Sequence, residues 1–100
     1  MFDENVRSGL EEIASQYSRY LAEVPDAHTL QFYPFRQKGG SFVWAIRFYN
    51  DHDTCRIYYQ GTSPNTEIEL GPKMGDVTKE WVSAKANRFI QDTVKSLGVE

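Results

Sequence analysis

The first quarter of the chain repeats apolar positions with a helical period. Apolar residues recur every three or four positions from Val6 to Val24, a spacing that places side chains on one face of a helix. Asp3 and Glu4 favour a helix start because the helix dipole stabilises acids there. Pro25 disfavours helical geometry at the residue before it. We therefore predict an amphipathic helix over residues 3–24.

The middle of the chain changes to short segments rich in β-branched and aromatic residues, separated by turn residues. Such segments favour strands. Pro34 lies within the first segment and predicts a sheet edge there, because proline cannot donate a ladder hydrogen bond. The fourth segment alternates, so we expect Ile68 and Leu70 to point inward and Glu67 and Glu69 outward. The predicted strands are residues 30–35, 41–49, 54–60 and 66–70.

The last quarter returns to a helical period. After a predicted loop at residues 71–75, Asp76 is a suitable N-cap, and Gly98 stands where a glycine commonly ends a helix. The inner arc of this helix is Val82, Ala86, Phe89, Ile90, Thr93 and Leu97. Short connections predict an antiparallel meander. The predicted fold is α+β, a two-layer sandwich in one domain spanning residues 1–100, with both helices on one face of a four-stranded sheet.

Strand alternation divides the sheet residues into two sets. The set expected to face the helices is almost wholly apolar: Leu30, Phe32, Phe42, Trp44, Ile46, Phe48, Cys55, Ile57 and Tyr59. The set expected to face outward is Tyr33, Phe35, Val43, Ala45, Arg47, Tyr49, Arg56, Tyr58 and Gln60. Aromatic residues mixed with arginine are enriched in protein interfaces, and they also stack single-stranded bases. Alternatively, they simply pair across strands at half-exposed positions.

Trp81 lies off the apolar arc of the C-terminal helix. An exposed tryptophan is a common anchor in the pocket of a partner. Alternatively, the first turn of the helix is bent, or the loop at residues 72–74 covers the indole. The candidate partner-binding residues are therefore Tyr33, Phe35, Arg47, Tyr49, Arg56, Tyr58 and Trp81.

Composition and charge narrow the functional classes. With 40% hydrophobic and 25% charged residues, the 100-residue chain has an ordinary globular composition. The net charge is −3, although residues 27–61 carry four bases against two acids. A duplex-binding domain usually has a basic stripe, so we rank nucleic acid below a protein partner. The longest apolar run, residues 42–46, is too short for a membrane span, and two acids near the start disfavour a signal peptide.

Candidate catalytic groups are few. Cys55 falls in the inward-facing set, where a thiol acts as a small hydrophobe. A lone cysteine forms no internal disulfide, which favours a cytoplasmic location. The turn at residues 51–53 has two carboxylates and an imidazole that could gather a metal ion, but no second cluster with metal-ligand spacing occurs. We expect no enzyme activity, no metal and no cofactor.

The order of elements is similar to that of double-stranded RNA-binding domains, with residues 79–85 where such domains begin their basic helix. Glu80 and Trp81 interrupt that stretch, and the chain has no Gly-Pro-x-His turn. A shared topology does not by itself assign a function. The leading hypothesis, from the outward-facing residues and the few catalytic groups, is a non-catalytic protein-binding module: an adaptor, inhibitor or immunity-type protein. Homodimerisation through the same sheet face is a variant. The alternative is a domain that binds single- or double-stranded nucleic acid with that face.

Overall fold

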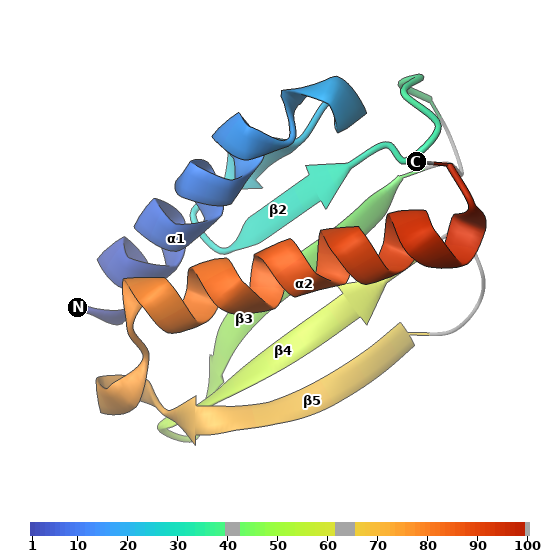
Figure 1. Ribbon diagram of the computed structural model, residues 1–100. Coiled ribbons are helices and arrows are strands. Elements are labelled where there is room, and N and C mark those ends of the chain that lie inside the picture. The colour runs from blue at the N-terminus through green and yellow to red at the C-terminus, as the bar shows by residue number, and fades with distance from the viewer. Residues whose placement is uncertain (40–42, 62–65, 100) are drawn as a thin grey trace.

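The computed structural model describes residues 1–39, 43–61 and 66–99. Helix α1 (Phe2–Gln16) precedes the sheet and helix α2 (Lys79–Leu97) follows it. Figure 1 shows both helices on the same side of the sheet. The α+β class is therefore confirmed. The strands, which pair antiparallel in chain order, are β1 (Glu23–Asp26), β2 (Thr29–Phe32), β3 (Trp44–Asp51), β4 (Thr54–Gln60) and β5 (Thr66–Lys73).

Helix α1 is shorter than predicted, and the chain after it forms a strand, β1, that was not predicted. After a short 3₁₀ turn at Ser18–Tyr20, Leu21 adopts a left-handed conformation with φ of 56° and the chain leaves the helical path. Strand β1 then pairs with β2 across a turn in which Asp26 accepts a hydrogen bond of 2.9 Å from the backbone N–H of His28. Val24 packs against the core from this strand. The prediction of four strands is wrong. Val24 is the one apolar residue of this segment, and a single apolar residue fits either the last turn of an amphipathic helix or a short strand.

Proline positions also differ from expectation. Strand β2 lies between β1 and β3, so its predicted edge position is wrong. It ends at Phe32, which leaves the buried Pro34 outside the hydrogen-bonded ladder. The edges of the sheet are β1, which contains Pro25, and β5, which continues through Pro72 where a loop was predicted. Edge strands tolerate proline because only one side needs to pair.

Helix α2 begins later than expected. Thr78 rather than Asp76 is its N-cap, because the Thr78 hydroxyl accepts a hydrogen bond of 3.1 Å from the backbone N–H of Trp81. Asp76 belongs to the 3₁₀ turn at Met74–Asp76. Gly98 ends the helix in the left-handed conformation, as predicted. Most of the predicted inner arc is buried or packs on the core, whereas Leu97 is exposed.

The core lies between the helices and one face of the sheet. The inward-facing sheet residues that are fully buried are Leu30, Phe32, Ile46, Phe48, Cys55 and Ile57, which confirms the predicted face for them. Trp44 and Tyr59 pack at the margin of this core. Phe42 lies outside the described residues. Neither helix covers the opposite face of the sheet (Figure 1).

Candidate functional site

The sheet face opposite the helices carries four of the predicted binding residues. Residues directly opposite each other in an antiparallel pair share a face. Arg47 is opposite Tyr58, and Tyr58 is opposite Ile68. In the next row Arg56 stands between Tyr49 and Leu70. We call this surface the outer face; its residues are Arg47, Tyr49, Arg56, Tyr58, Ile68 and Leu70.

Two aliphatic residues of the outer face were expected in the core. Ile68 is 56% exposed and Leu70 is 65% exposed. The predicted orientation of β5 is wrong because Glu69 pairs with the buried Ile57. Lys85 of α2 forms an ion pair with Glu69 from the helix side of the sheet. Lys85 is therefore a charged partner for β5 on the helix side, and the side of β5 that carries Glu69 faces the helices.

Both arginines of the outer face lie near carboxylates. Arg56 forms an ion pair with Asp51. The hydrogen bond with His52, followed by that with Arg56, outweighs desolvation and holds the pKa of Asp51 below its ordinary value. The backbone N–H of His28 and, more weakly, the charge of Arg47 lower the pKa of Asp26. Neither guanidinium is therefore an unopposed positive charge.

Tyr33 and Phe35 lie beyond the last strand residue of β2, so the strand alternation that predicted them on the outer face does not apply to them. Both follow the end of β2 at Phe32. The backbone N–H of Tyr33 donates a hydrogen bond of 2.7 Å to the carbonyl of Tyr20. Phe35 is 46% exposed, and its ring meets Trp44 edge-to-face at 6.4 Å between centroids. Strand alternation assigned their face, and alternation ceases to apply where the strand ends.

Trp81 contacts the core rather than the outer face. Its ring meets Phe48 edge-to-face, with 5.6 Å between centroids. Gly71 of β5 lies against the indole, since a Cβ added at Gly71 would stand 3.1 Å from the Trp81 ring. Lys85 places its ammonium 6.0 Å from the ring centroid. The indole is thus half-buried beneath β5.

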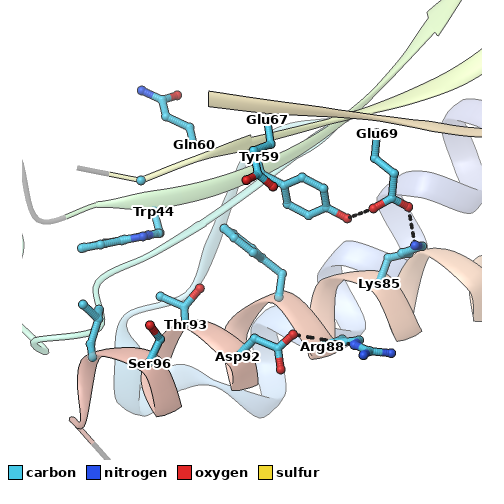
Figure 2. A pocket seen from close by; sticks show the side chains of 13 residues that line it. Trp44, Tyr59, Gln60, Glu67, Glu69, Lys85, Arg88, Asp92, Thr93 and Ser96 are labelled. Carbon is cyan, nitrogen blue, oxygen red and sulfur yellow. Dashed lines mark hydrogen bonds and ion pairs between the residues drawn. The ribbon is translucent and has the colours of Figure 1, made fainter. Parts of the chain in front are cut away.

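A groove of about 810 Å³ opens between α2 and the sheet (Figure 2). Trp44 and Tyr59 line it from the sheet, and Phe89 lines it from the helix. Glu69 connects its two sides, because it accepts a hydrogen bond of 3.0 Å from the Tyr59 hydroxyl and another from Lys85. The groove was not predicted from the sequence, because it exists only where α2 crosses the sheet. The aromatic character of the individual residues was the one available signal.

The Tyr59–Glu69–Lys85 cluster shifts two pKa values. Burial and the hydrogen bond to Glu69 raise the pKa of Tyr59. Burial also disfavours the charged form of Glu69, but the hydrogen bonds from Lys85 and Tyr59 and the charge of Lys85 outweigh it, so its pKa is lowered. A carboxyl group whose pKa is lowered by folding stabilises the fold above its unfolded pKa. That stabilisation is lost as pH falls through the folded pKa.

We therefore expect Glu69→Gln to make stability less dependent on acid pH. The wild type should be more stable than the variant above about pH 5, and the difference should shrink towards about pH 3 because Glu69 becomes protonated. Urea unfolding at several pH values measures this difference. Glu67→Gln, on the same side of β5, controls for the loss of a negative charge alone. A wild-type advantage independent of pH would contradict the assignment.

Cys55 is fully buried, and burial raises the pKa of its thiol to about 11. At about pH 8 the thiolate fraction should therefore be about 200-fold lower than for a free cysteine, whose pKa is about 8.5. We expect iodoacetamide to modify native Cys55 at least that much more slowly than the protein unfolded in guanidinium. Mass spectrometry of timed samples measures both rates. Equal rates would place the thiol at the surface.

Across residues 1–39, 43–61 and 66–99, no group of three or more His, Cys, Asp or Glu side chains could hold a metal ion. Within the same ranges, no helix is long and apolar enough to cross a membrane. Comparison with protein-family models, curated proteins and solved structures finds no match to this chain.

Proposed function

We propose that this protein is a non-catalytic module that docks a protein partner through its outer face. The observation that supports this function is the exposure of Ile68 and Leu70 beside Tyr58 and Arg56 on one side of the sheet. Antiparallel sheets in soluble proteins usually expose polar residues on a solvated face, and contiguous exposed apolar side chains mark interaction sites. We also propose a two-layer arrangement in which both helices cover the other face and leave this one open.

The residue types of the outer face are those of protein interfaces. Tyrosine and arginine are enriched among residues whose truncation weakens binding most. A tyrosine ring supplies apolar contact area, while its hydroxyl forms a hydrogen bond. Adaptor, inhibitor and immunity-type proteins all act by such docking without catalysis. We propose the cytoplasm as the location, because the chain's single cysteine, Cys55, is free and buried.

The charges around the outer face favour a protein over nucleic acid. Binding to phosphates depends on cations that replace the counterions of the nucleic acid. Arg56 is already paired with Asp51, and Arg47 lies close enough to Asp26 to lower the pKa of that carboxyl. Ile68 and Leu70 provide no aromatic plane for base stacking. Exposed aliphatic side chains beside arginines whose charge is partly balanced by carboxylates fit a protein partner better than a nucleic acid.

The decisive experiment compares capture from an extract of the source cells by three immobilised proteins: the wild type, Ile68→Ser/Leu70→Ser and Ala84→Ser. Ala84 is the control because it is an exposed apolar residue of α2 that belongs neither to the outer face nor to the lining of the groove. We expect a protein retained by the wild type and the control, and bound at least about 30-fold more weakly by the double variant, since burying a leucine or isoleucine side chain contributes roughly 1.5–3 kcal/mol. Equal capture by all three would refute the proposal.

Self-association through the outer face is the variant in which the partner is a second copy, because a two-fold pair buries the same patch on both copies. Sedimentation over a wide range of protein concentration tests it: a wild-type dimer should become monomeric in Ile68→Ser/Leu70→Ser. A monomer that captures no protein but retards labelled single strands at low salt would establish the nucleic-acid alternative instead. Arg47→Glu should then abolish the retardation.

A further inference from the structure

We propose that the groove between α2 and the sheet binds an organic cation: an amine or quaternary ammonium group attached to an apolar body. This site lies on the helix side of the sheet and is separate from the outer face. Its volume of about 810 Å³ is within the range of small-molecule sites. Three properties of the lining carry the assignment: its aromatic walls, the fixed positions of its rings and its excess of carboxylates.

The aromatic walls come from two elements that face each other. Trp44 and Tyr59 project from the sheet (Figure 2). Phe89, a residue of α2, lines the groove from the helix. The Tyr59 and Phe89 rings have centroids 5.1 Å apart. The face of an aromatic ring attracts a cation, and the attraction is strongest for tryptophan. Tyr59 and Phe89 are thus in contact with each other, and a ligand would meet the ring surfaces that these two side chains and Trp44 leave open to the groove.

Neighbouring contacts hold these rings in place before a ligand arrives. Phe89 meets the fully buried Phe32 edge-to-face at 5.7 Å between centroids. A Cβ added at Gly61 would lie 2.6 Å from the indole nitrogen of Trp44, so the Gly61 backbone lies directly against that ring. The Tyr59 hydroxyl is held by Glu69. Binding to rings already fixed in position costs little conformational entropy.

The charges that line the groove favour a cation over an anion. Its carboxylates are Glu67, Glu69 and Asp92, and its bases are Lys85 and Arg88. Lys85 is paired with Glu69, and Arg88 is 3.6 Å from Asp92. Across the described ranges, no ion pair joins Glu67 to a base. Glu67 thus supplies a negative charge beside the aromatic walls, and a bound cation would form an ion pair with its carboxylate.

A fluorescence titration tests the assignment. Trp81→Phe leaves Trp44 as the chain's single tryptophan, and Trp81 does not line the groove. The probes are benzyltrimethylammonium, benzenesulfonate, and the cation choline with its uncharged, water-soluble isostere 3,3-dimethylbutan-1-ol. We expect Trp44 emission to report binding of choline about tenfold tighter than its isostere, from cation–π and carboxylate attraction, with no binding of the anion. N-acetyltryptophanamide is the blank for direct quenching.

Variants separate the groove from other surfaces. Glu67→Gln should weaken cation binding about threefold or more while leaving the weak binding of the isostere unchanged. Glu12→Gln, an exposed acid of α1 away from the groove, should change neither. Ile68→Ser/Leu70→Ser should bind the cation like the wild type, so failure of the outer-face proposal and failure of this one are distinguishable. Far-UV circular dichroism checks that each variant is folded.

Two outcomes would overturn the inference: equal affinity for the cation and its isostere, or no change in Trp44 emission with any probe up to about 10 mM, a range that detects even millimolar Kd values. The same cation chemistry could come from a free amine or from a methylated lysine of a protein. A short peptide containing trimethyllysine, compared with benzyltrimethylammonium, distinguishes these sources. Tighter binding of the peptide would assign the groove to a protein side chain, and tighter binding of the small cation to a free ligand.

Discussion

Trp81→Ala should lower the free energy of unfolding by about 3 kcal/mol, the lower end of the usual cost of truncating a core aromatic. Trp81 is only half-buried, but its ring covers Phe48, which is fully buried. Truncation would leave a cavity between Phe48 and Gly71 and admit water to the core. For a chain of this size, a loss of about 3 kcal/mol lowers Tm by roughly 12–24 °C. Thermal and urea unfolding followed by circular dichroism measure the change.

Two further variants make this result specific. Trp81→Phe keeps an aromatic ring next to Phe48 and should lose less than half as much stability. Tyr58→Ala, on the outer face, should cost about 1 kcal/mol or less, the size of a cross-strand pair. If Tyr58→Ala instead melted far below Trp81→Ala, Tyr58 would belong to the core and Trp81 to the surface. The proposed docking face would then have to be abandoned.

Gly9→Val should destabilise the protein by about 3 kcal/mol, at the upper end of the cost of overpacking. A Cβ added at Gly9 would stand 2.8 Å from the carbonyl oxygen of Lys79 and 2.9 Å from the Cβ of Val82. The first is a backbone atom and the second belongs to a fully buried residue, so neither can give way easily. The two helices would have to separate.

Helix propensity alone predicts that the smaller change, Gly9→Ala, stabilises the protein. Glycine within a helix is about 1 kcal/mol less favourable than alanine, yet a contact below 3.0 Å costs more than this gain. We expect Gly9→Ala to lose about 1 kcal/mol net. The neighbouring Ser8→Ala, at an exposed position of the same helix, should gain a few tenths of a kcal/mol. A Gly9→Ala variant more stable than the wild type would mean that α1 and α2 are not in close contact there.

Separation of the helices would also break polar contacts between the two chain ends. The amide of Asn5 donates a hydrogen bond of 3.0 Å to the carbonyl of Val77, just before α2. Farther along, the Tyr17 hydroxyl donates to Asn87 in the middle of α2. In each of these two bonds, the donor and the acceptor are more than 65 positions apart in the chain. These bonds explain why a single added methyl group at Gly9 is expected to affect the whole helix layer.

Local patterns in the sequence determined the elements whose geometry depends on residues close together in the chain. Strand β4 has the predicted bounds, because alternation within the strand and turn residues on both sides agree. The end of α2 at Gly98 was predictable from the conformational freedom of that residue. Phe48 and Ile57 face the helices as expected, since their strands are regular. The same regularity placed Tyr49 and Tyr58 on the outer face.

Only the tertiary structure decided the features that depend on distant partners. Apolar and acidic residues alternate in β5, so either side of it could have faced the helices. Lys85 of α2 and the register with β4 turn Glu69 inward and leave Leu70 exposed. Residues 23 and 24 also fit the end of a helix, whereas in the structure they belong to β1, which pairs with β2. Local propensity cannot rank alternatives that differ only in contacts between residues far apart in the chain.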